Sequence, residues 1–246
     1  MSGGVTYDDA ATPDGMRIYA IGDIHGRADC LTDLLAKIEA EIARDRPADW
    51  RVVYLGDYVD RGPESARVLE TLAARVEADP RNIALEGNHD KVFAGFLADP
   101  TNWHQFADFD GAATARSYGV QIDFRDDRTV LRGQRELLAV VPQTHLAFLN
   151  GLRLSVNFGD FFFCHAGIRP GVPLDRQVEH DLIWIRGEFL DHRGLHPKLV
   201  IHAHTPNHQP EILANRVNLD TCAFATGRLT SMVMEGRTKR FMRSQR

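Results

Sequence analysis

Three short stretches of the chain place acidic, amide and imidazole groups beside glycines. "GDIHG" spans residues 22–26, "GDYVDRG" spans 56–62 and "GNHD" spans 87–90. Carboxylate and amide oxygens, together with imidazole nitrogens, suit ions such as Mn²⁺, Fe or Zn²⁺. The glycines let the backbone approach an ion closely. These stretches therefore predict a site for divalent cations.

Later histidines extend the same set. His165 follows the apolar run "FFFC", and His202 and His204 follow "KLVI". Taken singly, such a histidine is more often packed in a core than bound to a metal. The recurrence of candidate ligands after five apolar runs in one chain makes a shared site the better interpretation.

The elements that must position these residues are short apolar runs alternating with helical patterns. Residues 28–44 and the stretch around Val68 and Leu72 have apolar side chains at helical spacing. Five runs predict mostly buried strands: 16–21, 51–55, 82–86, 161–164 and 198–201. The β-α-β-α-β opening implies parallel strands in an α/β domain. Ligands bind at the carboxyl ends of such strands, so the polar residues should share one cleft there.

The rest of the chain predicts one domain. Residues 90–150 have a mainly helical pattern, and residues 152–164 predict two antiparallel strands joined near Asn157 to Asp160. The tail predicts further strands with a turn at Glu235 and Gly236. With no internal repeat or linker, we expect a flexible segment over 1–15 and a single catalytic domain over 16–246.

Composition bounds the class of protein. The 246 residues carry a formal net charge of -5, which argues against nucleic acid or an anionic membrane as a partner. No apolar run is long enough to span a bilayer, and the N-terminus has no signal-peptide pattern. Three widely spaced cysteines suit reduced thiols better than disulfides. Together these features predict a cytoplasmic protein.

At these stretches the chain resembles the metal-dependent phosphoprotein phosphatases, in their bacterial branch, within the calcineurin-like metallophosphoesterases. The family's ordered signatures GDxHG, GDxVDRG and GNH[DE] match the three stretches. "HAGIRPGVP" (165–173), "DLIWIRGEF" (181–189), "HAHTP" (202–206) and "NLDTCAF" (218–224) are similar to its later blocks. The resemblance covers residues 17–235. It implies a central β-sandwich of mixed sheets flanked by α-helices (α/β/β/α).

The resemblance also implies two divalent metal ions, for which Mn²⁺ is the expected identity and Fe or Zn²⁺ the alternatives. The first ion would be held by Asp23, His25 and Asp57. The second would be held by Asp57, Asn88, His165 and His204, with Asp57 bridging the pair. His202 is not counted as a ligand.

Four further residues match catalytic positions of the family. His89 matches the general acid and Asp60 the carboxylate that orients it, while Arg61 and Arg186 match the two phosphate-clamping arginines. The implied reaction is hydrolysis of a phosphomonoester by a hydroxide bridging the metals. Two positions depart from the bacterial pattern, because Ala203 and Cys222 stand where glycine is usual.

The substrate is the open point. The "GDYVDRG" form favours a serine/threonine protein phosphatase acting on a phosphoprotein or a small phosphorylated molecule. The alternative is a diadenosine polyphosphate phosphohydrolase, which would need stacking surfaces such as Trp103, Trp184 or Tyr118, although core packing is the expected role of each. A nuclease, or an inactive binding scaffold of the same fold, is less favoured. The oligomeric state, the native metal, activity on tyrosine phosphate and the roles of His202 and Cys222 are left open.

Overall fold

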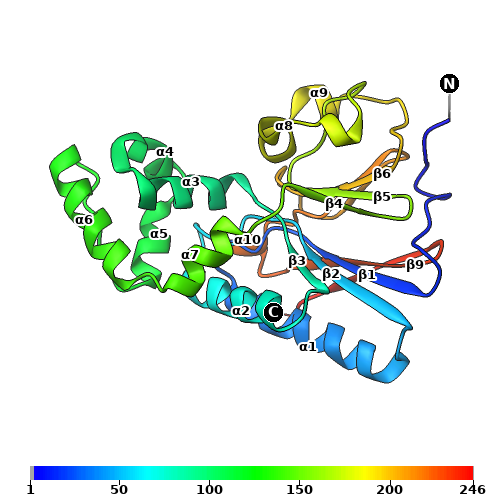
Figure 1. Cartoon of the computed structure of the whole chain (residues 1–246), viewed down its shortest axis with the longest axis horizontal. Coiled ribbons are helices and arrows are strands. Elements are labelled where there is room, and N and C mark those ends of the chain that lie inside the picture. The colour runs from blue at the N-terminus through cyan, green and yellow to red at the C-terminus, as the bar shows by residue number, and fades with distance from the viewer. Residues whose placement is uncertain (1–2, 246) are drawn as a thin grey trace.

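Two β-sheets packed face to face form the centre of the protein (Figure 1). The computed structural model describes residues 3–245. Within that range the first sheet has the strand order β10-β9-β1-β2-β3 and the second the order β4-β5-β6-β8-β7. The strands of the first sheet are β1 (Met16–Ile21), β2 (Asp49–Tyr54), β3 (Asn82–Ala84), β9 (Thr230–Glu235) and β10 (Thr238–Arg243). Those of the second are β4 (Ser155–Phe158), β5 (Phe161–Cys164), β6 (Leu199–His202), β7 (Glu211–Ile212) and β8 (Arg216–Asn218).

Both sheets are mixed. In the first, β1, β2 and β3 run parallel, whereas β9 and β10 pair antiparallel. In the second, β5, β6 and β8 are parallel, and β4 and β7 are antiparallel edges. The predicted β-α-β-α-β opening and the predicted antiparallel pair before Cys164 are therefore confirmed.

Strand alternation explains how the sheets pack. On β1, Ile18 and Ala20 face the second sheet, where they meet Phe161 and Phe163 of β5. Tyr19, between them in sequence, points to the opposite face and joins the core under the helices. Successive side chains on a strand point to opposite faces, so one apolar run serves two cores.

Helices cover the outer face of each sheet. The amphipathic helices α1 (Ala28–Asp45) and α2 (Ser65–Ala78) pack on the first sheet through Leu31, Leu34 and Leu69 among others. The short helices α8 (Glu179–Trp184) and α9 (Gly187–Leu190) pack on the second sheet against Phe162 and Val200. The resulting α/β/β/α arrangement confirms the predicted fold class.

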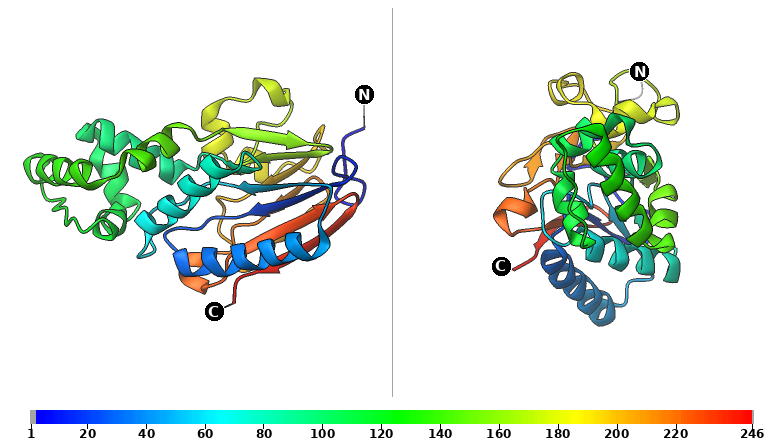
Figure 2. Two further views of the ribbon diagram at one scale, coloured as in Figure 1. Left: turned by 60° about the horizontal axis from the view of Figure 1, so that its bottom comes forward. Right: turned by 90° about the vertical axis from the view of Figure 1, so that its left-hand side faces the viewer.

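A helical lobe extends from one end of the sandwich (Figures 1 and 2). Aromatic stacking of Phe106 on Phe93 and Phe96 holds its core. Its helices are α3 (Asn88–Ala98), α4 (Trp103–Asp108), α5 (Gly111–Ser117), α6 (Asp127–Val140) and α7 (Gln143–Asn150), with the 3₁₀ turn η1 (Pro100–Asn102). The 3₁₀ turn η2 (Leu174–Arg176) and α10 (Ala223–Thr226) complete the helices of the described chain.

The start of the described chain lies against the second sheet and its connections. The N–H groups of Val5 and Tyr7 donate to the carbonyls of His196 and Ala214, and Ala10 is fully buried. Residues 1–2 and 246 lie outside the described residues. Flexibility of residues 1–15, and the extent of a single domain over 16–246, stay predictions.

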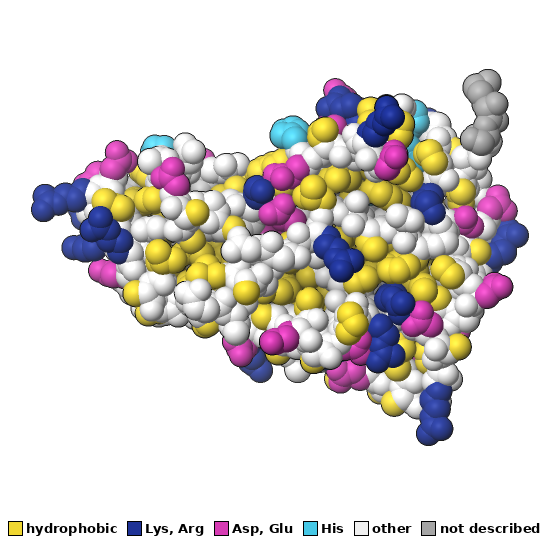
Figure 3. Space-filling model, viewed as in Figure 1, with side chains coloured by type: hydrophobic (Ala, Val, Ile, Leu, Met, Phe, Trp, Pro, Cys, Tyr) yellow, Lys and Arg dark blue, Asp and Glu magenta, His cyan; other side chains and the backbone are white. Residues whose placement is uncertain are grey.

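The surface mixes charges of both signs. On the face shown in Figure 3, Lys and Arg side chains are interspersed with Asp and Glu over both the sandwich and the lobe. Among the helices of residues 3–245, none is both long and apolar enough to cross a membrane.

Candidate metal centre

The carboxyl ends of the strands meet at the junction between sandwich and lobe, and the predicted ligands lie there. Asp23 and His25 follow β1, and Asp57 follows β2. Asn88 opens α3 directly after β3, while His165 and His204 follow β5 and β6. All six residues are buried. Five of the six line a pocket of about 160 Å³, and His165 lies directly behind it, in contact with Asp57.

The first predicted group contains Asp23, His25 and Asp57. The Nε2 atom of His25 lies 3.5 Å from Oδ2 of Asp57 and 4.0 Å from Oδ2 of Asp23. Its Nδ1 atom is held 2.7 Å from the carbonyl of Val59, so Nε2 is the atom turned toward the carboxylates. Neither His25 Nε2 nor Asp23 Oδ1 has a hydrogen-bond partner among the described residues. Buried polar atoms are almost always paired, so these two mark a place for a ligand.

The second predicted group converges on Asn88. Its Oδ1 atom lies 2.9 Å from Nε2 of His165 and 2.8 Å from Nδ1 of His204. The same Nε2 of His165 lies 3.4 Å from Oδ2 of Asp57. Asp57 therefore stands between the two groups, within reach of both.

The electrostatics of the site suit cations. Burial raises the pKa of the Asp23 carboxyl, and the facing carboxylates of Asp220 and Asp57 raise it further. Burial lowers the pKa of His25 to about 3 and that of His204 to about 2, so both imidazoles are neutral at physiological pH. Metal ions need ionised carboxylates and neutral imidazoles, and their charge would relieve the repulsion among the carboxylates. The donor set therefore fits divalent cations.

The backbone of the site is strained at half of the predicted site residues. Five of the ten predicted site residues have a positive φ, in the region that favours glycine: His25 (44°), Asp57 (54°), Asp60 (68°), Arg61 (65°) and His204 (67°). Each such residue costs of the order of 1 kcal/mol or more. Cys222 also has a positive φ, of 53°, which explains why glycine suits that position. Strain of this kind is concentrated where side chains must converge.

Asp90 and Gly87 hold Asp57 in place. Oδ2 of Asp90 accepts the N–H groups of Asp57 at 2.8 Å and Gly87 at 3.1 Å, and its Oδ1 accepts the N–H of Tyr58 at 2.9 Å. A Cβ atom on Gly87 would lie 2.2 Å from both the backbone nitrogen and Oδ1 of Asp57. The loop after β2 can therefore lie against the start of α3 only because residue 87 has no side chain.

His89 lies at the start of α3 with a fixed ring. Its Nδ1 atom is 2.8 Å from Oδ2 of Asp60, and its ring stacks on Phe109 with a centroid distance of 4.1 Å. Oδ1 of Asp60 accepts the hydroxyl of Thr114 at 2.6 Å, and the N–H of Asp60 donates to the same hydroxyl oxygen at 2.8 Å. Because Asp60 and Thr114 are fully buried, this chain of hydrogen bonds sets the orientation of the imidazole.

Both predicted arginines line the pocket. Nη2 of Arg61 lies 3.3 Å from Nε2 of His89, and its guanidinium lies 4.8 Å from the ring centroid of Phe224. Nε of Arg186 donates to Nε2 of His204 at 3.1 Å. The pocket therefore has two guanidinium cations in its lining, which suits the binding of an anion.

Four residues at the site were not predicted from the sequence: Asp90, Phe109, Thr114 and Asp220. Asp90 and Asp220 lie inside the stretches "GNHD" and "NLDTCAF", which match the family. An acidic residue inside such a stretch is a signal that could have marked each of them as part of the site. Phe109 and Thr114 belong to the helical lobe, and nothing in their local sequence marks them.

Other expectations concern residues near the site. His202 is fully buried, with Nδ1 3.0 Å from the carbonyl of Ala203 and Nε2 3.4 Å from Nη1 of Arg216, and it does not line the pocket. Of the three aromatic residues considered for stacking, Trp184 lines the pocket. Trp103 is buried, and the Tyr118 hydroxyl lies 2.7 Å from Nδ1 of His145, within the lobe.

Known proteins resemble this chain both in sequence and in structure. The sequence pattern of the calcineurin-like phosphoesterases matches residues 16–227. The chain is 24% identical to the bis(5'-nucleosyl)-tetraphosphatase PrpE [asymmetrical] of Anoxybacillus flavithermus, over 86% of this chain and 88% of that protein. It is 25% identical to the protein of the same name from Geobacillus thermodenitrificans, over 88% and 90% of the two chains. A crystal structure described as a putative diadenosine tetraphosphatase has a TM-score of 0.63 and 20% identity, covering 96% and 99% of the chains.

The prediction of a serine/threonine protein phosphatase is wrong. The relatives that match most of the chain are named for cleavage of bis(5'-nucleosyl) tetraphosphates, which favours the alternative. The physical reason lies in "GDYVDRG". Asp57, Asp60 and Arg61 all face the predicted metal centre or His89. These residues belong to the predicted metal centre, which all phosphate esters would share, so the motif does not distinguish one class of phosphate ester from another.

Fold, family pattern and relatives agree on the class of protein. The match covers residues 16–227, which include all three opening signatures and both later histidine stretches. The chain belongs to the calcineurin-like phosphoesterases.

Proposed function

We propose that the chain hydrolyses bis(5'-nucleosyl) tetraphosphates at a centre of two divalent cations. The observation that carries this proposal is the aromatic lining of the pocket. Phe109 and Trp184 stand beside the predicted ligands and arginines, with ring centroids 5.8 Å apart. Phosphoryl groups bind through charge and hydrogen bonds and gain little from an aromatic ring, whereas a nucleoside beside the pocket can stack on one. The names of the relatives support the same substrate class.

Two groups of residues would hold the cations. Asp23, His25 and Asp57 would hold one, and Asp57, Asn88, His165 and His204 the other. Oxygen and imidazole ligands without a thiolate suit Mn²⁺, Fe and Zn²⁺, and Mn²⁺ is the ion we would test first. When bound, such ions supply Lewis-acid chemistry: they activate water and neutralise charge on phosphoryl oxygens.

The other residues would act on the phosphate chain. Arg61 and Arg186, which both line the pocket, would bind phosphoryl oxygens and stabilise the charge that grows on them. The Nε2 atom of His89 faces the pocket because Asp60 occupies Nδ1, so His89 would donate a proton from Nε2 to the leaving oxygen. Asp60 would keep the imidazole in the protonation state and orientation needed for that transfer.

The test is a comparison of substrates on purified protein supplied with Mn²⁺. We expect diadenosine tetraphosphate to be cleaved with a kcat/KM about 100-fold or more above that for a phosphoserine peptide. Chromatography of the products then distinguishes asymmetrical cleavage, to ATP and AMP, from symmetrical cleavage, to two ADP. Equal or faster cleavage of the peptide would contradict the proposal.

A further inference from the structure

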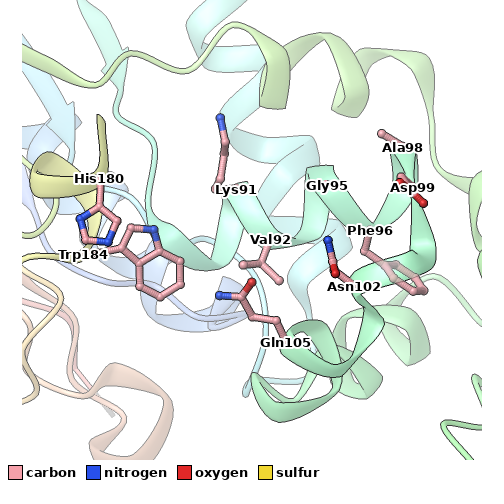
Figure 4. Close-up of a pocket in the computed structure, with 10 residues that line it drawn as sticks. All are labelled: Lys91, Val92, Gly95, Phe96, Ala98, Asp99, Asn102, Gln105, His180 and Trp184. Atoms are coloured by element: carbon pink, nitrogen blue, oxygen red, sulfur yellow. The ribbon is translucent and has the colours of Figure 1, made fainter. Parts of the chain in front are cut away.

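A second cavity opens beside the pocket of about 160 Å³ that five of the predicted ligands line, which we call the metal pocket. The second cavity has a volume of about 720 Å³ and lies between α3, the turn η1 with α4, and α8 (Figure 4). We call it the lobe groove and define it by Val92, Gly95, Asn102, Gln105, His180 and Trp184. The salt bridge from Lys91 to Glu179, with Nζ 3.0 Å from Oε1, links α3 to α8 at its edge.

The two cavities differ in volume, so each fits a different part of the substrate. The metal pocket, at about 160 Å³, is smaller than the roughly 300–1,000 Å³ of sites that enclose a drug-sized molecule. It has room for phosphoryl groups but not for a nucleoside as well. The lobe groove falls within that range. A nucleoside attached to a phosphate in the metal pocket must therefore lie outside it, and the groove is the adjoining space of the right size.

Trp184 connects the two cavities. Its side chain is half-buried and lines both, with its ring centroid 5.8 Å from that of Phe109 and 6.5 Å from that of His204. Its indole N–H makes no hydrogen bond within residues 3–245. His180 lies one helical turn before it on α8, so the two rings are on the same side of that helix (Figure 4). The groove thus has a flat aromatic wall at the end nearest the phosphates, as base stacking requires.

Two amides are available to bind the edge of a base. Asn102 and Gln105 line the groove, and both side chains are exposed. Neither side-chain amide has a hydrogen-bond partner in the described part of the chain. In Figure 4 the amide of Gln105 lies on the side of the groove nearest Trp184. An amide offers a donor and an acceptor together, the pattern that pairs with N6 and N7 of adenine.

From these features we infer that the lobe groove binds one nucleoside of the substrate, with its base stacked on Trp184 and its edge hydrogen-bonded to Gln105. The inference rests on the proposed function, because it assigns a place to a nucleoside that only such a substrate carries. It makes the groove between the helical lobe and α8 the part of the protein that selects dinucleoside polyphosphates from other phosphate esters.

Gly95 provides the test. It lies on α3, lines the groove, and a Cβ atom added there meets nothing within 4 Å. A Cβ atom at residue 95 displaces no neighbour, so Gly95→Phe should place a ring at the groove, and replacement of a helical glycine favours the helix. Gly95→Ala is the matched control, because it makes the same backbone change and leaves the groove open.

The readout is kcat/KM on two substrates. For diadenosine tetraphosphate we expect Gly95→Phe to lose about tenfold or more, as removal of one stacked base does, and Gly95→Ala to lose less than twofold. For p-nitrophenyl phosphate, which has no nucleoside, both variants should match the unmodified protein. Gln105→Ala, at an exposed position, should lower kcat/KM for the dinucleotide alone, mainly through KM.

The outcomes separate the two proposals. An unmodified protein that does not cleave diadenosine tetraphosphate would overturn the proposed function and this inference together. An unmodified protein that does cleave it, with Gly95→Phe and Gln105→Ala equally active on it, would overturn the inference alone. Equal loss on both substrates would show a general disturbance of the site and would also overturn it. A loss confined to a phosphoserine peptide would assign the groove to a peptide instead.

Discussion

The Nδ1 atom of His89 lies 2.8 Å from Oδ2 of Asp60, and both side chains are almost fully buried. The pairing leaves Nε2 as the nitrogen that faces the pocket. A histidine held in this way can donate a proton from one defined position, and that is the role we propose for it.

His89→Gln tests that role. Loss of a general acid should lower kcat on phenyl phosphate, a poor leaving group, by about 10²–10⁴-fold. On p-nitrophenyl phosphate the loss should be much smaller, because that leaving group needs little protonation. Steady-state kinetics on the two substrates gives the comparison. Losses of equal size would remove His89 from the proton transfer.

Thr114 is predicted to position Asp60. Thr114→Val deletes a hydroxyl that both donates to Oδ1 of Asp60 and accepts its N–H. The buried Oδ1 then loses its hydroxyl donor, while the N–H keeps its contact with Oγ of Ser65 at 3.1 Å. The free energy of unfolding in urea should fall by about 1–3 kcal/mol. The loss of kcat should again be larger on phenyl phosphate than on p-nitrophenyl phosphate. Thr114→Ser keeps the hydroxyl, so it should retain most of the free energy of unfolding and most of the kcat on phenyl phosphate. If the serine variant is as unstable and as slow as the valine variant, the assignment is wrong.

Asp23→Asn should raise the stability of the metal-free protein and reduce the stability that Mn²⁺ adds. Without metal, the substitution removes a buried charge that faces Asp57 and Asp220, so the free energy of unfolding should rise by about 1–2 kcal/mol. With Mn²⁺ added, the unmodified protein should gain thermal stability, while the variant should gain much less. Thermal unfolding with and without Mn²⁺, after treatment with a chelator, measures both. A variant destabilised in both states would show that Asp23 has a purely structural role.

Gly87→Ala should disturb the metal centre through Asp57. The new methyl group would lie 2.2 Å from the nitrogen and Oδ1 of Asp57, so that carboxylate must move. We expect at least a tenfold loss of Mn²⁺ affinity by isothermal titration calorimetry. Gly95→Ala, where the added carbon meets nothing, serves as the control. Unchanged affinity in Gly87→Ala would mean that Asp57 is not a shared ligand.

His196 should make the protein sensitive to acid away from the metal centre. Burial lowers its pKa to about 4, helped by His192 and Arg216, whereas in the unfolded chain it is near 6.5. The unfolded state therefore takes up the proton first, and stability is lost as the pH falls from 6.5 toward 4.

His196→Phe removes that proton-binding site and keeps a ring against Phe189, which stacks on His196 at 5.7 Å. We would measure the free energy of unfolding of metal-free protein in urea at pH 7 and at pH 4.5. Between these pH values it should fall by about 2–3 kcal/mol less in the variant than in the unmodified protein. His208→Gln, at an exposed position, is the control and should change nothing. An identical loss in His196→Phe would show that His196 does not titrate in this range.

Local patterns were enough to predict the strands and helices of an α/β domain, whereas the packing of two sheets into a sandwich was implied by the family resemblance. The run 16–21 coincides with β1, and the predicted helix over 28–44 ends one residue before α1 does. Each pattern is local, because strand alternation and helical spacing are properties of neighbouring residues. The predicted ligands also converge, since the carboxyl ends of parallel strands must meet at one edge of a sheet.

What the sequence did not predict depends on contacts between distant segments. Thr114 reaches Asp60 across 54 residues, and Phe109 reaches His89 across 20. Both come from the helical lobe, whose placement follows from packing rather than from any motif. Substrate class was misjudged for a related reason. The residues of "GDYVDRG" lie at the predicted metal centre, while the lobe groove, to which we assign the nucleoside, is assembled from α3, η1, α4 and α8.

The positive φ angles at the metal centre affect the lifetime of the protein. Six non-glycine residues in this conformation, five of them predicted site residues and the sixth Cys222, together cost several kcal/mol. A whole domain is stable by only about 5–15 kcal/mol. If the predicted ligands hold two ions, a newly made chain that has not acquired them would carry the strain without the compensation, and it would unfold and be degraded more readily than the loaded protein. Metal supply would then set the abundance of this protein as well as its activity.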